Sequence, residues 1–198
     1  MTMKLIKIVI IAILLCSCDN NMSKYKQEIQ LCFHNYMKHL ADKEFEEGFN
    51  YMPNELFQYI SRNRLKRIYE EIYKDDVFDI TLLNPEVKEI EDSIKIEDKY
   101  YTLLSFKERT DFKIKTSNKS LEEKEQEIEV LNKSLKKAFG YFNVTYRDEN
   151  TTFEVRTEKR ACAILNEGSK ADWKFLILEK DNLLLQKLIP KKLFNELW

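Results

Sequence analysis

Apolar side chains in the first third of the chain recur three and four positions apart, which is the spacing of a helix that buries one face. A helix is predicted to begin at Ser23, followed by a short helix at 42–51, one or two turns at 54–60 and a further helix from Ser61. The positions expected to face inward in the first and last of these helices are Tyr25, Ile29, Cys32, Phe33, Tyr36, Leu40, Leu65, Ile68 and Ile72.

The pattern changes at Val77 to an alternation of apolar and polar residues, which is typical of β-strands. The alternation runs through 77–83 and 87–91 and is broken by Asn84-Pro85, which predicts a strand with a bulge or kink at that point. A longer strand is predicted at 99–115, and its early residues are apolar on both faces. Because such a strand is covered on both sides, we expect other elements to pack on both faces of this sheet.

One charged helix is predicted between the strands. Residues Ser120 to Glu123 read SLEE, the pattern of a capping box, so the helix is expected to begin there and to end near Phe139. Its narrow apolar stripe consists of Leu121, Ile128, Leu131 and Leu135. The charged residues on its other faces indicate a solvated surface.

The last third of the chain is predicted to be rich in short strands, and a helix opened by Pro190 is expected to close it at Trp198. The strands are predicted at 141–146, 151–156, 160–166, 173–179 and 183–188. Helices followed by antiparallel strands with one inserted helix describe an α+β domain, which we expect to occupy residues 23–198.

The N-terminus has the layout of an export signal. Lys4 and Lys7 precede an apolar run from Ile8 to Leu15, and small or polar residues follow. A membrane-crossing helix needs about 20 predominantly apolar residues, and this run has roughly half of that length. Residues 1–17 are therefore expected to be a removable signal peptide.

The segment Leu15-Cys16-Ser17-Cys18 resembles the lipobox of bacterial lipoproteins, in which a leucine at position −3 and a small residue at position −1 precede the modified cysteine. The resemblance selects Cys18 for attachment of acyl chains such as palmitate, with residues 18–22 as a polar leader. Two or more acyl chains hold a protein stably at a bilayer. We therefore expect a lipid-anchored protein of the bacterial cell envelope, at either the inner or the outer membrane. An ordinary secretory signal and an uncleaved hydrophobic anchor remain the alternatives.

Charge and cysteine content bear on whether the chain binds nucleic acid, holds zinc or forms a disulfide. Removing residues 1–17 takes away two lysines and no acid, which leaves 31 bases, 34 acids and a net charge of −3. A chain of this charge is not expected to bind nucleic acid. Cys32 and Cys162 lack the His or Cys neighbours that a zinc site needs. They are expected either to form a disulfide or to be buried free thiols.

The order of elements resembles the NTF2-like superfamily, an α+β cone in which N-terminal helices close one side of a strongly curved antiparallel sheet. The resemblance is carried by the opening YKQEIQLCFHNYMKHLADKEFEEGFNYMPNELFQYI, the hairpin YFNVTYRDENTTFEV and the closing segment DWKFLILEKDNLLLQKLIPKKLFNEL. It implies one domain, with N-terminal helices packed on a curved antiparallel sheet that forms a cone.

Enzymes of this superfamily place Asp, His or Tyr side chains in the open end of the cone, and no such set stands out in this sequence. His34 and His39 are five residues apart in one helix, so their side chains diverge by about 140° and cannot share a metal ion. No nucleophile, phosphate-binding or zinc motif occurs. We therefore assign no catalytic residue, metal ligand or cofactor. The side chains expected to line a pocket are Tyr36, Tyr101, Tyr146 and Trp173.

Two functions are compatible with the sequence. The favoured hypothesis is a non-catalytic domain, held at the membrane by the lipid on Cys18, that binds a small hydrophobic ligand or another envelope protein. The alternative is a small-molecule enzyme of the isomerase or dehydratase type. Such an enzyme would use a tyrosine and a carboxylate that faces the cone, and Asp111 and Glu154 are the acids on predicted strands that we consider.

Overall fold

The computed structural model of the protein describes residues 23–115, 120–179 and 182–197, so Cys18 and the predicted signal peptide lie outside the described residues. The predicted α+β fold is confirmed. Its helices are α2 (Lys24–Ala41), α3 (Phe45–Phe49), α4 (Arg62–Tyr73), α5 (Leu121–Phe139), α6 (Leu185–Leu188) and α7 (Lys191–Leu197), with 3₁₀ helices η1 (Asn54–Gln58), η2 (Tyr141–Asn143) and η3 (Asp148–Asn150). Its strands are β1 (Phe78–Leu82), β2 (Glu86–Ile90), β3 (Ile94–Ile96), β4 (Lys99–Ile114), β5 (Val144–Arg147), β6 (Thr152–Asn166) and β7 (Lys174–Leu178).

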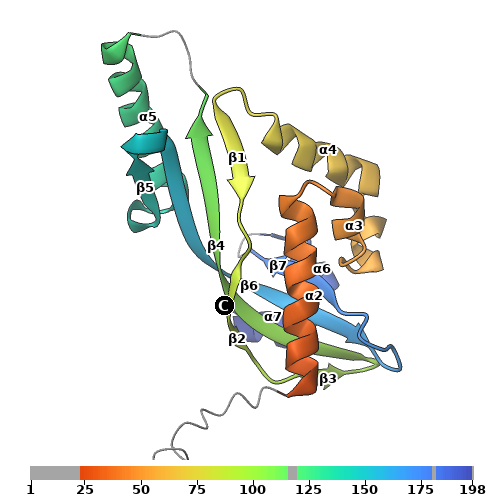
Figure 1. Cartoon of the computed structure of the whole chain (residues 1–198). Helices are drawn as coiled ribbons and strands as arrows, with labels where there is room; N and C mark the ends of the chain where they lie inside the picture. Colours follow the sequence, from red (N-terminus) through yellow and green to blue (C-terminus); the bar gives the residue numbers. More distant parts are fainter. Residues whose placement is uncertain (1–22, 116–119, 180–181, 198) are drawn as a thin grey trace, which may run out of the picture.

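Two long strands form the centre of a curved, seven-stranded antiparallel sheet. β4 and β6 pair continuously from Lys99 opposite Asn166 to Lys113 opposite Thr152. β1, β2 and β3 pair with successive parts of the edge of β4 that faces away from β6. β5 and β7 pair with the two ends of β6. Both long strands bend along their length, so the sheet curves without closing (Figure 1).

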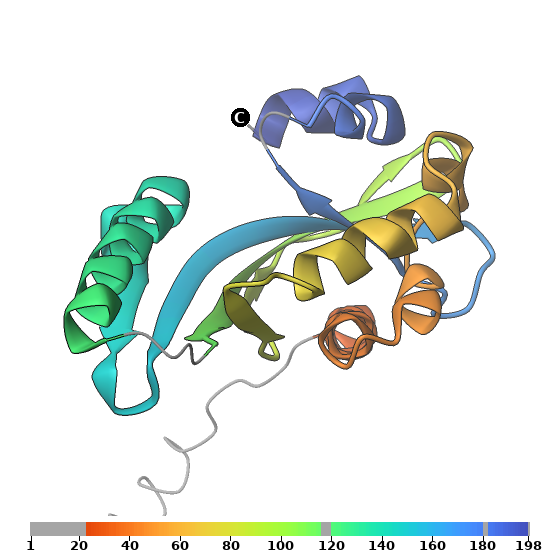
Figure 2. The same ribbon diagram turned by 90° about the horizontal axis from the view of Figure 1, so that it is seen from above.

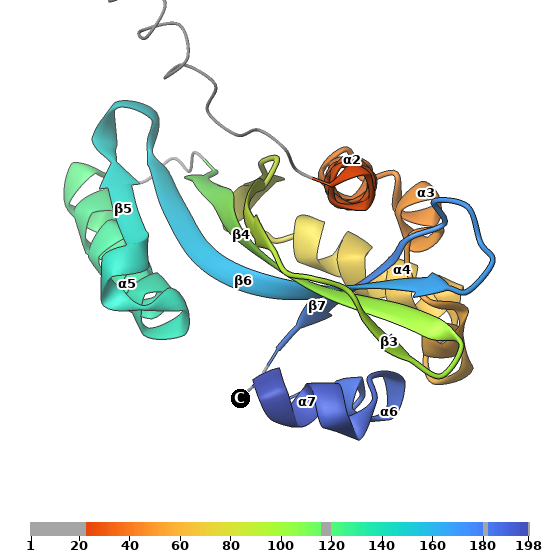
Figure 3. The ribbon, with the colours of Figure 1, turned by 90° about the horizontal axis from the view of Figure 1, so that it is seen from below.

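Helices cover the sheet in three places. α2, α3 and α4 lie over one end, and α5 lies with β5 at the other end (Figure 1). α6 and α7 lie on the opposite face of the sheet from α2 (Figures 2 and 3). Each group has its own apolar core, with Phe33 and Phe106 under α2, Phe153 under α5, and Leu103 under α6 and α7. The expectation that other elements pack on both faces of the sheet is thus confirmed.

Local signals in the sequence placed several helix ends correctly. The Ser61 side chain accepts a hydrogen bond from the backbone N–H of Arg64 at the start of α4. The capping box of α5 is present, since Ser120 and Glu123 satisfy one another's backbone N–H groups. The helix after Pro190 is also present as α7. In the part of the chain that the structure describes, no helix has both the length and the apolar character needed to cross a membrane.

Several predictions about individual elements were wrong, and Leu121, predicted on the apolar stripe of α5, is 81% exposed. The two strands at 151–156 and 160–166 are one strand, β6, because the polar residues Thr157 and Glu158 pair with β4 like their neighbours. Residues 183–188 do not form a strand, since Leu185–Leu188 is the short helix α6. In α4 the inward face is formed by Leu65, Tyr69 and Tyr73, whereas the predicted Ile68 and Ile72 are exposed.

Candidate functional site

The four predicted pocket residues lie in three different cores. Tyr36 and Trp173 belong to the core under α2, where the Tyr36 ring stacks on Phe175 with 5.8 Å between ring centroids. Tyr101 belongs to the core under α6 and α7, on the opposite face of the sheet. Tyr146 packs on Phe153 in the core under α5. The structure therefore does not bring the four side chains together around one cavity.

Burial keeps these tyrosine hydroxyls protonated. The pKa of Tyr36 is raised well above its usual value, because its phenol is buried under α2. Burial likewise raises the pKa values of Tyr101 and Tyr146. A phenol with a raised pKa is a weak proton donor near neutral pH, so these three tyrosines are poorly suited to acid–base chemistry.

Trp173 is the predicted residue that borders an open recess. The recess has a volume of about 390 Å³ and lies between the first turn of α2, the link from β2 to β3, and the adjacent ends of β4 and β6. The residues that line it are Tyr25, Asp92, Ser93, Tyr100, Leu165 and Trp173. A volume of this size lies in the range of small-molecule sites.

Aromatic rings from three separate elements form the walls of this recess. Tyr25 comes from α2, Tyr100 from β4 and Trp173 from the segment just before β7. The side chain of Trp173 is buried, and its indole Nε1 has no hydrogen-bond partner. A buried donor without an acceptor costs about 1–3 kcal/mol, so Trp173 carries an unsatisfied polar group at the border of the recess.

Asp92 stands at the rim of the recess. Its Oδ1 atom accepts a hydrogen bond of 3.2 Å from the Tyr25 hydroxyl and lies 2.8 Å from Lys26 Nζ. The ammonium of Lys26 lowers the pKa of Asp92, and 91% of the carboxylate side chain is exposed. Asp92 is therefore an ionised, neutralised carboxylate, and it lacks the raised pKa of a catalytic general acid.

Ser93, the neighbour of Asp92, faces the sheet. Its hydroxyl forms a hydrogen bond of 2.6 Å with the hydroxyl of Thr102, which is fully buried on β4. This bond fixes the link between β2 and β3 against the strand that carries Tyr100. The floor and the rim of the recess are thus held in one arrangement before any ligand arrives, which lowers the entropic cost of binding.

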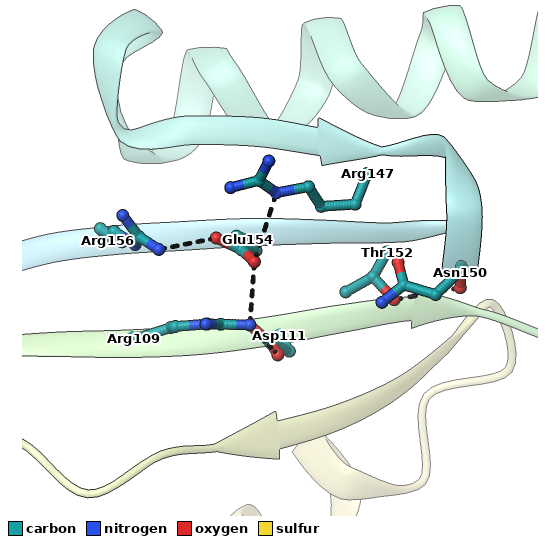
Figure 4. Close-up of polar contacts among 7 residues, drawn as sticks. All are labelled: Arg109, Asp111, Arg147, Asn150, Thr152, Glu154 and Arg156. Carbon is teal, nitrogen blue, oxygen red and sulfur yellow. Dashed lines mark hydrogen bonds and ion pairs between the residues drawn. The ribbon is translucent and has the colours of Figure 1, made fainter.

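A second cluster of polar groups surrounds Glu154 on the opposite face of the sheet from α5 (Figure 4). Arg109 Nη2 and Arg156 Nη2 each lie 2.9 Å from a Glu154 oxygen, and Arg147 Nε lies 3.4 Å away. Arg109 also holds Asp111 in a two-pronged ion pair, with both distances 2.7 Å. Only 9% of the Glu154 side chain is exposed because the guanidinium groups cover it.

The chemistry of the Glu154 cluster is that of a cross-strand clamp. Its arginines come from β4, β5 and β6, so one carboxylate joins three strands at the point where β5 joins the sheet. Bidentate and multiple arginine–carboxylate contacts are among the stronger hydrogen-bonded ion pairs in proteins. Glu154 and Asp111 are thus placed to stabilise the sheet, and neither stands beside a tyrosine that could act as its catalytic partner.

The two histidines occupy different surroundings. His39 Nδ1 lies 2.7 Å from Glu44 Oε2 at the end of α2, where the pair ties α2 to the start of α3. His34 is exposed and lines a groove of about 520 Å³ between α2 and β2, together with Leu31 and Val87. Among the described residues, no group of three His, Cys, Asp or Glu side chains is placed to hold a metal ion.

Both cysteines of the described chain are free thiols. Cys32 packs against the core under α2, whereas Cys162 is buried in the core under α6 and α7. The sheet separates them, so they are not placed to form a disulfide. Burial raises the pKa of Cys162 to about 12, and it raises that of Cys32 as well.

Sequence reasoning missed most of the recess. Tyr25 was expected to face the core, and Tyr100 was expected on a strand, but no pattern linked them to Asp92 or Leu165. These residues are far apart along the chain and meet only because Tyr100 pairs with Leu165 while α2 crosses above them. No protein-family model and no curated protein matches the chain. Its function is therefore inferred from the geometry of the recess and from the N-terminal sequence.

Proposed function

We propose that the protein is a lipid-anchored binding protein of the bacterial cell envelope, with an NTF2-like domain that holds a small ligand in the recess beside Trp173. The observation that carries this proposal is the buried, unpaired Nε1 donor of Trp173 at the edge of an aromatic-lined recess. The ligand is a compact, largely apolar molecule that carries one hydrogen-bond acceptor. Its apolar part lies between the rings, and its acceptor pairs with the indole N–H.

The electrostatics of the rim favour a neutral ligand. Three aromatic rings beside a carboxylate are the usual recognition site for an organic cation. Here the ammonium of Lys26 lies 2.8 Å from Asp92, and Lys95 lies over the ring of Tyr100. Lys26 neutralises Asp92 and Lys95 is paired with Glu167, so the rim offers no uncompensated carboxylate to a cationic ligand. An uncharged ligand with an acceptor oxygen fits this balance better.

Binding is favoured over catalysis at this site. An isomerase or dehydratase needs a carboxylate or phenol whose pKa lies near the working pH. The Tyr25 hydroxyl and the Asp92 carboxylate, which are hydrogen-bonded to each other, are groups of the type that such an enzyme uses. However, the pKa of Asp92 is lowered by Lys26, which makes this carboxylate a weak base. The recess therefore supplies shape and a hydrogen-bond donor, with no group tuned for proton transfer.

The proposed anchor places the recess close to the membrane. Lipid attached to Cys18 would lie five residues before Ser23, where α2 is about to begin. An extended chain spans at most about 3.6 Å per residue, so the start of α2 lies within about 18 Å of the anchored cysteine. Tyr25, in the first turn of α2, lines the recess. A ligand that partitions into the bilayer therefore has a short path to the site.

Mass spectrometry of the protein purified from bacterial membranes tests both parts of the proposal. Under denaturing conditions the mass reports covalent lipid, because acyl chains on Cys18 survive unfolding. Under native conditions the mass reports covalent lipid together with any ligand in the recess. We expect a native excess mass that disappears on denaturation. Absence of covalent lipid contradicts the anchor alone, and absence of a native excess contradicts the ligand alone, in favour of a protein partner.

Two matched variants locate the ligand. Leu165→Lys places an ammonium group in the recess, where it displaces an apolar ligand. Leu31→Lys makes the same chemical change in the groove between α2 and β2, which is outside the recess. The native excess mass is expected to be lost from the first variant and kept by the second. Loss from both variants, or from neither, would contradict the assignment of the ligand to the recess.

A further inference from the structure

The turn that follows α5 exposes a group of aromatic side chains, which we call the aromatic tip and define as Phe139, Tyr141 and Phe142. Phe142 is 95% exposed, which is the highest value among the large exposed apolar side chains of the described residues. Tyr141 is also mostly exposed, and it contacts Phe142 with 5.4 Å between ring centroids. Single exposed apolar residues are common, whereas two exposed aromatic rings in contact with each other form a larger apolar surface.

The aromatic tip is held in a fixed conformation. Gly140 adopts a φ of 97°, which other residues rarely adopt, and this allows the chain to reverse after α5. The Asn143 side chain donates a hydrogen bond of 2.7 Å to the backbone carbonyl of Phe139. The ring of Phe139 packs on Phe112 of β4 and so fastens the turn to the sheet. Phe142 is therefore kept away from the core by the structure of the turn.

Basic residues surround the aromatic tip. Residues 130–147 contain Lys133, Lys136, Lys137 and Arg147 and no acid, although the whole chain has a net charge of −1. Lys136 Nζ lies 4.5 Å from the centre of the Tyr141 ring. Lys133 pairs with Glu129 and Arg147 with Glu154, so the positive charge next to the turn comes from Lys136 and Lys137. Positive charge and exposed aromatic rings thus occur on the same protrusion.

We propose that the aromatic tip inserts into the headgroup region of a bilayer that contains anionic lipid. Aromatic side chains accumulate at the boundary between headgroups and hydrocarbon, and nearby lysines are attracted to anionic headgroups. A protein partner would need complementary acids and a shape that receives Phe142. A lipid surface needs only the combination of rings and basic residues that the tip provides. This contact goes beyond the binding recess and does not require a lipid on Cys18.

Fluorescence of a tryptophan placed at the tip tests the contact. Phe142→Trp in the full chain is mixed with, or reconstituted into, vesicles of phosphatidylcholine with phosphatidylglycerol, some carrying bromine on their acyl chains. Tyr59→Trp is the matched control, because Tyr59 is also exposed and also lies under a lysine, in this case Lys187. Tyr59 follows η1, near the α3 and α4 end of the molecule and far from α5 (Figure 1).

After subtraction of the emission of Trp173 and Trp198 in the natural protein, we expect the Phe142→Trp emission to shift to the blue and to be quenched by brominated lipid, while the Tyr59→Trp emission changes little. Adding Lys136→Glu and Lys137→Glu, or raising the salt concentration, is expected to reduce the quenching at the tip. Equal quenching at both positions, or quenching at neither, would overturn the proposal. A blue shift that depends on protein concentration and not on vesicles would also overturn it, because the tip would then contact a second copy of the chain.

Discussion

The hydroxyl of Tyr25 donates a hydrogen bond to Asp92 across a sequence separation of 67 residues. This bond fastens the first turn of α2 to the link between β2 and β3, and both residues line the recess. Lys26 contacts the same carboxylate from the same turn of α2. The wall of the recess nearest the N-terminus is therefore held by polar contacts at its rim.

Removing the Tyr25 hydroxyl should loosen this wall with a small effect on the whole fold. Tyr25→Phe is expected to lower the free energy of unfolding by about 0.5–1 kcal/mol, because the bond is exposed and water replaces it. Hydrogen exchange of the backbone around Asp92 should become faster, while exchange in β4 stays unchanged. Tyr59→Phe is the control, since the Tyr59 ring is exposed at the end of η1. Equal exchange around Asp92 in both variants would argue against a fastening role.

Replacing Trp173 by phenylalanine should weaken ligand binding and leave the stability of the fold almost unchanged. The change keeps an aromatic ring at the edge of the recess and removes the unpaired N–H. We expect the free energy of unfolding to change by less than about 1 kcal/mol, since the loss of packing is offset by the removal of a costly donor. Ligand affinity should fall about tenfold, which corresponds to one hydrogen bond of about 1.4 kcal/mol. Unchanged affinity would mean that the ligand does not accept from Trp173.

Loss of the Glu154 carboxylate should destabilise the sheet, because three arginines depend on it. Glu154→Gln leaves three arginines facing one another without their common carboxylate, so the free energy of unfolding is expected to fall by about 1–3 kcal/mol. Added sulfate should restore part of the loss by binding between the arginines. Glu158→Gln on the same strand and face is the control and should change stability by less than about 0.5 kcal/mol. Denaturant unfolding at two sulfate concentrations measures both effects, and equal losses in the two variants would contradict the clamp.

An ion pair between η1 and β4 should make stability depend on acid pH. Glu55 Oε1 lies 2.5 Å from Lys99 Nζ, and this contact lowers the pKa of Glu55 below its ordinary 4.5. A lowered pKa in the folded state gives stability that is present above the ordinary pKa and is lost as the pH falls through the folded value. Because the pair is partly exposed, Glu55→Gln should cost about 0.2–1 kcal/mol at pH 7.

The same variant should differ less from the natural protein as the pH falls below 4. Urea unfolding of both proteins between pH 7 and pH 3 follows this difference. Glu86→Gln provides a comparison, since Glu86 is paired with Lys88 on the same strand and joins no distant elements. A difference between the natural protein and Glu55→Gln that grows toward acid pH would contradict the assigned sign.

The two free cysteines should react at very different rates. Cys162 is fully buried and its pKa is raised to about 12, so it is a protonated thiol near neutral pH. Cys32 is only partly buried, although its pKa is also raised. Iodoacetamide at pH 8 should modify Cys32 first and Cys162 only at the rate of unfolding, as peptide mapping would show. Recovery of a disulfide-linked peptide pair would contradict their placement on opposite faces of the sheet.

The fold was predictable where the signals were local. Helix starts at Ser61 and Ser120 depend on side chains three positions away, so the sequence contains the whole interaction. The strand between Thr157 and Lys159 was not predictable, because its polar residues stay in the sheet through backbone pairing with β4. The apolar run that becomes α6 was ambiguous, since short apolar runs occur in both strands and buried helices.

The site was less predictable than the fold because it depends on which side chains share a face and a place on the sheet. Tyr101 and Tyr100 are neighbours in sequence, yet Tyr101 lies in the core under α6 and α7 while Tyr100 lines the recess. Alternation along a strand predicts opposite faces but not which face carries the opening. Trp173 was singled out from the sequence, whereas its partners were defined only by the crossing of α2 over β4 and β6.

The pairing of β4 with β6 also sets the time at which the chain can fold. Each β4 residue and its partner in β6 are at least 39 residues apart in the chain, with the whole of α5 in between. Contacts of such long range form slowly, and here they must wait until residues 152–166 have been synthesised. A nascent chain that lacks these residues has no central sheet. The complete sheet therefore forms late in synthesis, after β6 has been made.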